Sequence, residues 1–122
     1  MKIRIRGNSI RYRLTKSEVA NFAATGLLVN KTEFGESEFM YALESSSDID
    51  QLSATMIGNK ITLLVPEKIK NEWTTSETVG FNHKMPIGDG RELFLLIEKD
   101  FICLDHTHED QSDNYPNPGK VC

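Results

Sequence analysis

Residues 2–14 read Lys-Ile-Arg-Ile-Arg-Gly-Asn-Ser-Ile-Arg-Tyr-Arg-Leu, and this segment gives the clearest indication of the fold. Apolar and basic residues alternate with a period of two on both sides of Gly7-Asn8, as expected of half-buried strands. A Gly-Asn pair between two such segments is typical of a tight hairpin turn. The stretch therefore predicts a β-hairpin with one apolar face and one basic face.

A short helix is expected directly after this hairpin. The sequence Thr15-Lys16-Ser17-Glu18 matches a capping box, in which two side chains satisfy free backbone amides of the first helical turn. An apolar stripe with helical spacing follows, and Gly26 is placed to end the helix. Pro66-Glu67 opens a second short helix, because proline is tolerated in the first turn.

Short strands separated by close turns are expected along the rest of the chain, at about 27–34, 38–44, 54–57, 61–65, 78–85, 92–97 and 101–104. A turn is expected at 98–100. We see no internal repeat. The pattern predicts an α+β domain with a mainly antiparallel, strongly curved sheet or partial β-barrel of seven to eight short strands and two short helices. Residues 1–104 are expected to form this single domain, and residues 105–122 an acidic C-terminal tail packed on it.

The overall composition argues against several classes of protein. A hydrophobic share of 39% and a charged share of 26% are typical of a globular domain. No apolar run reaches the ~18 residues that a membrane span needs, and the alternating start of the chain argues against a secretory signal. The net charge of −4 argues against a dedicated nucleic-acid binder. Because 2 cysteines cannot form a disulfide framework, a reducing cytoplasm is the expected location.

The charges are distributed unevenly along the chain. Residues 1–16 contain basic side chains and no acid, whereas residues 103–122 contain four acids against one lysine. On the first hairpin, four arginines can share one face, where their like charges repel and require an anion: Arg4, Arg6, Arg11 and Arg13. The planar guanidinium group suits carboxylates and phosphates alike.

Two hypotheses for this basic face stay open. In the first, acids of the same chain neutralise it, with these candidates: Asp105, Glu109, Asp110, Glu18, Glu33 and Glu36. In the second, an external anion binds there, either a phosphate-bearing ligand or a nucleic acid. We favour the first, because it would also order a polar tail that buries too little surface to offset its ordering entropy.

The tail also offers a candidate metal site. Its sulfur and imidazole donors are the ligand types that zinc prefers: Cys103, His106, His108 and Cys122. Their spacing matches no standard zinc motif, so no cofactor is expected, and zinc stands as the alternative. A disulfide between Cys103 and Cys122 would close a short loop, but a reducing compartment disfavours it.

A family resemblance rests on two stretches of the chain. The first is Met-Lys-Ile-Arg-Ile-Arg-Gly-Asn-Ser-Ile-Arg-Tyr-Arg-Leu-Thr at residues 1–15. The second is Ile-Glu-Lys-Asp-Phe-Ile-Cys-Leu at 97–104, followed by an acidic stretch and Tyr-Pro-Asn-Pro at 115–118. Both are similar to a family of short, uncharacterised bacterial proteins. The resemblance implies a cytoplasmic domain of unknown function with no established catalytic residues, and His106 and His108 are not part of its pattern.

The functional prediction is a small binding or interaction domain rather than an enzyme. Walker, dinucleotide-binding and zinc-protease motifs are absent from the sequence. The expected partner is a small anionic ligand, another protein or a second copy of the chain, with neither nucleic acid nor a membrane involved. The alternative is a metal-binding regulatory or hydrolytic protein that uses the Cys/His/acid segment at the C-terminus.

Overall fold

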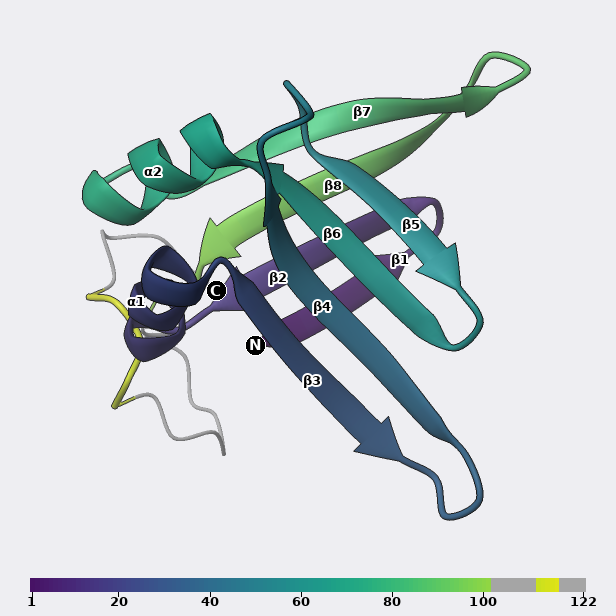
Figure 1. Ribbon diagram of the computed structural model, residues 1–122, viewed down its shortest axis with the longest axis horizontal. Coiled ribbons are helices and arrows are strands. Elements are labelled where there is room, and N and C mark those ends of the chain that lie inside the picture. Colours follow the sequence, from purple (N-terminus) through teal and green to yellow (C-terminus); the bar gives the residue numbers. More distant parts are fainter. Residues whose placement is uncertain (102–111, 117–122) are drawn as a thin grey trace.

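The computed structural model describes residues 1–101 and 112–116 of the chain, and Figure 1 shows their arrangement. Each of the two helices lies between two β-hairpins in the sequence. In chain order, the elements are β1 Lys2–Arg6, β2 Ser9–Leu14, α1 Lys16–Thr25, β3 Leu27–Glu33, β4 Glu38–Ser46, β5 Ser53–Ile57, β6 Lys60–Pro66, α2 Glu67–Thr75, β7 Gly80–Gly88 and β8 Arg91–Lys99.

The strands form two four-stranded sheets whose strands cross one another, with both helices at one end (Figure 1). Sheet A has the order β1-β2-β8-β7, and sheet B has the order β3-β4-β6-β5. In each sheet the outer pairs are antiparallel hairpins, whereas the central pair is parallel: β2 with β8 in sheet A and β4 with β6 in sheet B.

The α+β class with two short helices is confirmed, but the expectation of a mainly antiparallel, strongly curved sheet or partial barrel is wrong in part. Both sheets are mixed, and they are not joined into a barrel. The reason is the path of the chain: each helix carries it from one sheet to the other, so sheet A joins hairpins from opposite ends of the sequence, whereas sheet B joins two consecutive hairpins. They meet through central strands that run in the same direction.

The topology contains a repeat that the sequence analysis did not find. The units β1-β2-α1-β3-β4 and β5-β6-α2-β7-β8 have the same order, and each sheet combines the first hairpin of one unit with the second hairpin of the other. Both first hairpins turn at a Gly-Asn pair with the glycine at positive φ, 52° for Gly7 and 58° for Gly58. Glycine at the first central position is typical of a type II′ turn.

The inner faces of the sheets form one hydrophobic core. Alternate residues of β2 and β8 bury their side chains from sheet A, as do alternate residues of β6 from sheet B. Phe22 of α1 and Trp73 of α2 are fully buried against them. The hydroxyl of the buried Tyr12 donates to the carbonyl of Ile61 (3.3 Å), which joins the two sheets. Burial raises the pKa of this phenol.

The predicted helix start is present. The backbone N–H of Thr15 donates to Glu18 Oε1 (2.9 Å), as in a capping box, and the amino group of Met1 pairs with the same carboxylate. Gly26 ends the helix in the left-handed region (φ 71°), and its N–H donates to the carbonyl of Phe22 (2.8 Å).

The described part of the tail, residues 112–116, lies beside α1 in Figure 1. The N–H of Lys16 donates to the carbonyl of Asp113 (3.1 Å), and Ser17 Oγ donates to Asp113 Oδ2 (2.5 Å). Tyr115 pairs with Phe101 through a parallel β-bridge, with ring centroids 5.6 Å apart. The proposed boundary between residues 104 and 105 lies outside the described residues.

Candidate anion-binding surface

The outer face of sheet A carries the basic side chains of the first hairpin. Tyr12 and its alternate neighbours in β2 point into the core, so the intervening positions face outward. The β1–β2 register pairs Lys2 with Arg13, Arg4 with Arg11, and Arg6 with Ser9. Two guanidinium groups therefore occupy directly opposed positions on one face, an arrangement that is destabilising unless an anion lies close by.

A single carboxylate on the neighbouring strand balances part of this charge. Arg13 Nε donates to Glu98 Oε1 at 2.5 Å, and Arg11 Nε lies 3.6 Å from the same oxygen. Glu98 is in β8, directly opposite Arg13 in the parallel β2–β8 register. At the start of β1, directly opposite Arg13, Lys2 Nζ lies 3.0 Å from Asp100 Oδ2.

Arg4 and Arg6 have no such partner in the described part of the chain. Among the residues that the structure describes, no carboxylate lies within ion-pair distance of either guanidinium group. Their side chains line a hollow of about 90 Å³ together with Ser9 and Arg11. An anion with several oxygens could accept hydrogen bonds from all three guanidinium groups there, since each offers up to five N–H donors.

The acids proposed to neutralise this face lie elsewhere or outside the described residues. Glu18 pairs with the amino group of Met1, and Glu33 lies 3.4 Å from Lys31. The three tail candidates, Asp105, Glu109 and Asp110, lie outside the described residues. Asp113, a tail acid that was not among the candidates, contacts Ser17 at the start of α1.

Glu98, which pairs with two arginines, was missed in the sequence analysis. It was assigned to a turn at 98–100, but β8 continues to Lys99. The sequence gives no local signal for it, because residues 93–97 are apolar throughout; only the burial pattern of the strand places Glu98 on the face opposite Leu95 and Ile97.

The four residues proposed for a metal site all lie outside the described residues: Cys103, His106, His108 and Cys122. The same holds for the proposed disulfide. Within residues 1–101 and 112–116, no group of three or more His, Cys, Asp or Glu side chains is arranged to hold a metal ion. In that same part of the chain, neither helix is long and apolar enough to cross a membrane.

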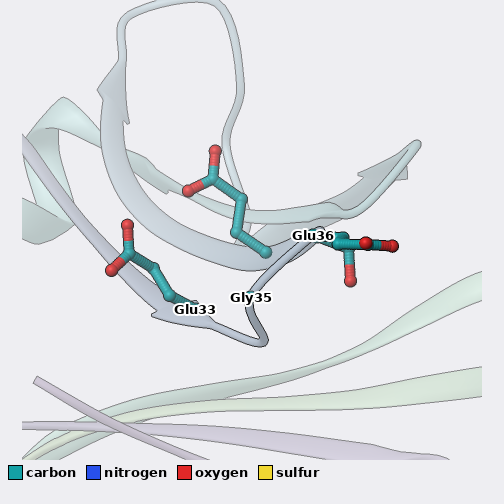
Figure 2. Close-up of a pocket in the computed structure, with 5 residues that line it drawn as sticks. Glu33, Gly35 and Glu36 are labelled. Atoms are coloured by element: carbon teal, nitrogen blue, oxygen red, sulfur yellow. The ribbon is translucent and has the colours of Figure 1, made fainter.

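The turn between β3 and β4 is acidic but is not a metal site. It encloses a hollow of about 160 Å³ that Glu33, Glu36 and Glu38 line (Figure 2). The figure shows Glu33 and Glu36 on different sides of the turn, with their carboxylates apart. Lys31 Nζ lies 3.4 Å from Glu33 and 3.6 Å from Glu38, so a lysine already balances two of the three acids.

Comparison with known proteins identifies a family. The model of a family of unknown function (DUF7009) matches residues 1–119, so the chain belongs to this family. No curated protein and no solved structure matches the chain. The match confirms the resemblance to a family of unknown function, and the family itself assigns no activity.

Proposed function

We propose that this member of the family acts by binding, and that its ligand is a compact anion carrying a phosphate group. The proposed binding surface consists of Arg4, Arg6, Ser9 and Arg11 on the outer face of sheet A. Because two cysteines favour a reducing compartment, we also propose a cytoplasmic setting.

One observation carries this proposal. Arg4 and Arg11 are directly opposed across the hairpin, and among the described residues neither Arg4 nor Arg6 has a carboxylate partner. The concentration of positive charge contrasts with a net charge of −4 for the chain. A phosphate group provides several acceptor oxygens and up to two negative charges. It can therefore pair with the three guanidinium groups that line the hollow better than a single carboxylate can.

The proposal is tested by NMR titration of the full chain with inorganic phosphate and with pyrophosphate. We expect the amide resonances of residues 4–11 to shift, and the affinity to fall as the ionic strength rises. In an Arg4→Gln/Arg6→Gln double variant, we expect the dissociation constant to rise about tenfold or more, equivalent to losing one charge-assisted hydrogen bond.

A Lys60→Gln/Lys68→Gln double variant is the matched control. It removes the same formal charge from β6 and α2 and leaves the β1–β2 hairpin unchanged. Equal loss of binding in both double variants would indicate non-specific attraction, and an absence of binding to either anion would refute the proposal.

The acidic tail is the competing occupant of the same face. A variant that neutralises its acids, Asp105→Asn/Glu109→Gln/Asp110→Asn, separates the two. If the tail covers the arginines, phosphate affinity should rise in this variant. An unchanged affinity would leave the external anion as the ligand of this surface.

A further inference from the structure

Lys99 ends β8 on the face that points into the core. It follows Leu95 and Ile97 in the strand alternation and pairs in register with Leu14, all three fully buried. Only 6% of Lys99 itself is exposed. A buried lysine is unusual, because its charge must be removed from water. That burial lowers its pKa, although the nearby Glu77 charge opposes the shift.

The ammonium group of Lys99 carries three N–H donors. Within the described residues, one of them donates to the carbonyl of Ser76 at 2.7 Å. The charge also lies 5.9 Å from the ring centroid of Trp73 and 5.6 Å from that of Tyr115, within the range of cation–π attraction. Across the described part of the chain, no carboxylate lies within ion-pair distance of it.

A cavity of about 370 Å³ opens beside this group, between the end of β8, the segment after α2 and residues 115–116. Val79, Phe101, Tyr115 and Pro116 provide mostly apolar walls, and Lys99 lines it with Ser76 and Glu77. The volume falls in the range of small-molecule sites, about 300–1,000 Å³, which typically combine apolar walls with a few polar groups that fix orientation.

We infer that this cavity binds a small carboxylic acid with an aromatic or aliphatic body. The ligand carboxylate accepts hydrogen bonds from Lys99 Nζ, and its apolar body packs against Phe101 and Tyr115. A singly charged head group fits better than a phosphate, because one ammonium group supplies the positive charge and Glu77 disfavours a second negative charge. The site is separate from the arginine surface and goes beyond the proposed phosphate-binding function.

Phenylacetate and its neutral analogue phenylacetamide test the inference on the full, unmodified chain. The chain has a single tryptophan, Trp73, whose ring faces Lys99, so its fluorescence should change as the cavity fills. We expect phenylacetate to bind about tenfold or more tightly than the amide, since only the acid forms a charge-assisted hydrogen bond. Equal affinities, or no binding of the acid, would overturn the inference.

Variants at two lysines locate the site. Lys99→Met keeps a long apolar side chain but removes the ammonium group, and it should abolish the preference for the acid over the amide. Lys84→Met, at an outward position of β7, should leave that preference unchanged. A Lys99→Met protein that folds and still prefers the acid would refute the assignment. If this variant fails to fold, the acid–amide comparison on the unmodified chain still decides.

The Arg4→Gln/Arg6→Gln variant separates this inference from the proposed function. It should lose phosphate binding and keep phenylacetate binding. Loss of both ligands together would place the carboxylate on the arginine surface and overturn the cavity assignment.

Discussion

Glu98 shows how one side chain can both stabilise the fold and limit its affinity for an anion. Its carboxylate lies between two guanidinium groups, at 2.5 Å from Arg13 Nε and 3.6 Å from Arg11 Nε. The carboxylate is mostly covered, with 18% of its side chain exposed, so solvent screens the pair less than a fully exposed one. Any anion that binds near Arg11 therefore shares this guanidinium group with Glu98.

Replacing Glu98 by glutamine should change stability and binding in opposite directions. The unfolding free energy should fall by about 1–2 kcal/mol, because hydrogen bonds between charged groups are lost. Phosphate affinity should rise, because a negative charge leaves the surface. Urea denaturation and phosphate titration measure the two effects.

Glu44→Gln is the control for Glu98→Gln. It removes the same charge from an exposed position on β4, in the other sheet. Should both variants change phosphate affinity equally, net charge rather than the Glu98 contact would be the cause.

The end of β8 also explains why sequence reasoning missed two functional candidates. Glu98, Lys99 and Asp100 are three consecutive charged residues after an apolar run, a pattern typical of a turn. The strand continues because distant backbone groups extend its hydrogen bonding: Lys99 N–H donates to Val79 (2.9 Å) and Asp100 N–H to Leu14 (2.8 Å). No local pattern reports these partners, so neither the pairing of Glu98 nor the burial of Lys99 was predictable.

The start of α1 combines a local feature that the sequence predicts with a distant one that it does not. The capping contact between Thr15 and Glu18 spans three residues and was predicted from the motif. The contact of Asp113 with Lys16 and Ser17 joins segments that are far apart in the sequence, with Asp113 lying 96 positions after Ser17. An acid at the N-terminus of a helix is favourable, because free N–H groups and the helix dipole attract negative charge there.

Acidification should release this contact. Hydrogen bonds from the Ser17 and Thr15 side chains hold the pKa of Asp113 below its ordinary value of 3.8. The stabilisation is therefore complete above that ordinary value and is lost as the pH falls through the lower folded-state pKa. An NMR titration should show the Ser17 amide resonance moving in this acidic window.

An Asp113→Asn variant should remove the titration of the Ser17 amide while the capping contact between Thr15 and Glu18 persists. A Ser17 amide that titrates identically in the variant would show that another acid, such as Glu18, is responsible.

At the level of the complete domain, local hairpins were predictable and their partners were not. The Gly-Asn turns at 7–8 and 58–59 fix where each first hairpin reverses, and alternation fixes which faces are apolar. The sequence of neither hairpin indicates that β2 pairs with β8 or that β4 pairs with β6. The β2–β8 contact joins segments near opposite ends of the chain, whereas the β4–β6 contact passes over β5 alone, and both helices close the same end of the core.

The same two turns hold the halves of the domain together. The Asn8 side chain donates to the carbonyl of Glu92 (2.6 Å), and the carbonyl of Asn8 accepts from Phe94 N–H (3.0 Å). In the other sheet, the Asn59 side chain donates to the carbonyl of Glu38, and the carbonyl of Asn59 accepts from Met40 N–H (2.9 Å). Each turn therefore clamps the start of a strand that belongs to the other unit.

If this repeat is an energetic feature as well as a topological one, Asn8→Ala and Asn59→Ala should have similar effects. Each removes one side-chain hydrogen bond and should lower the unfolding free energy by about 0.5–1.5 kcal/mol in urea denaturation. Because the turns lie in different sheets and share no partner, their effects should add in the double variant. Asn82→Ala, at an exposed position of β7, is the control. A marked loss of unfolding free energy in only one of the two variants would show that the units share a topology but are not stabilised in the same way.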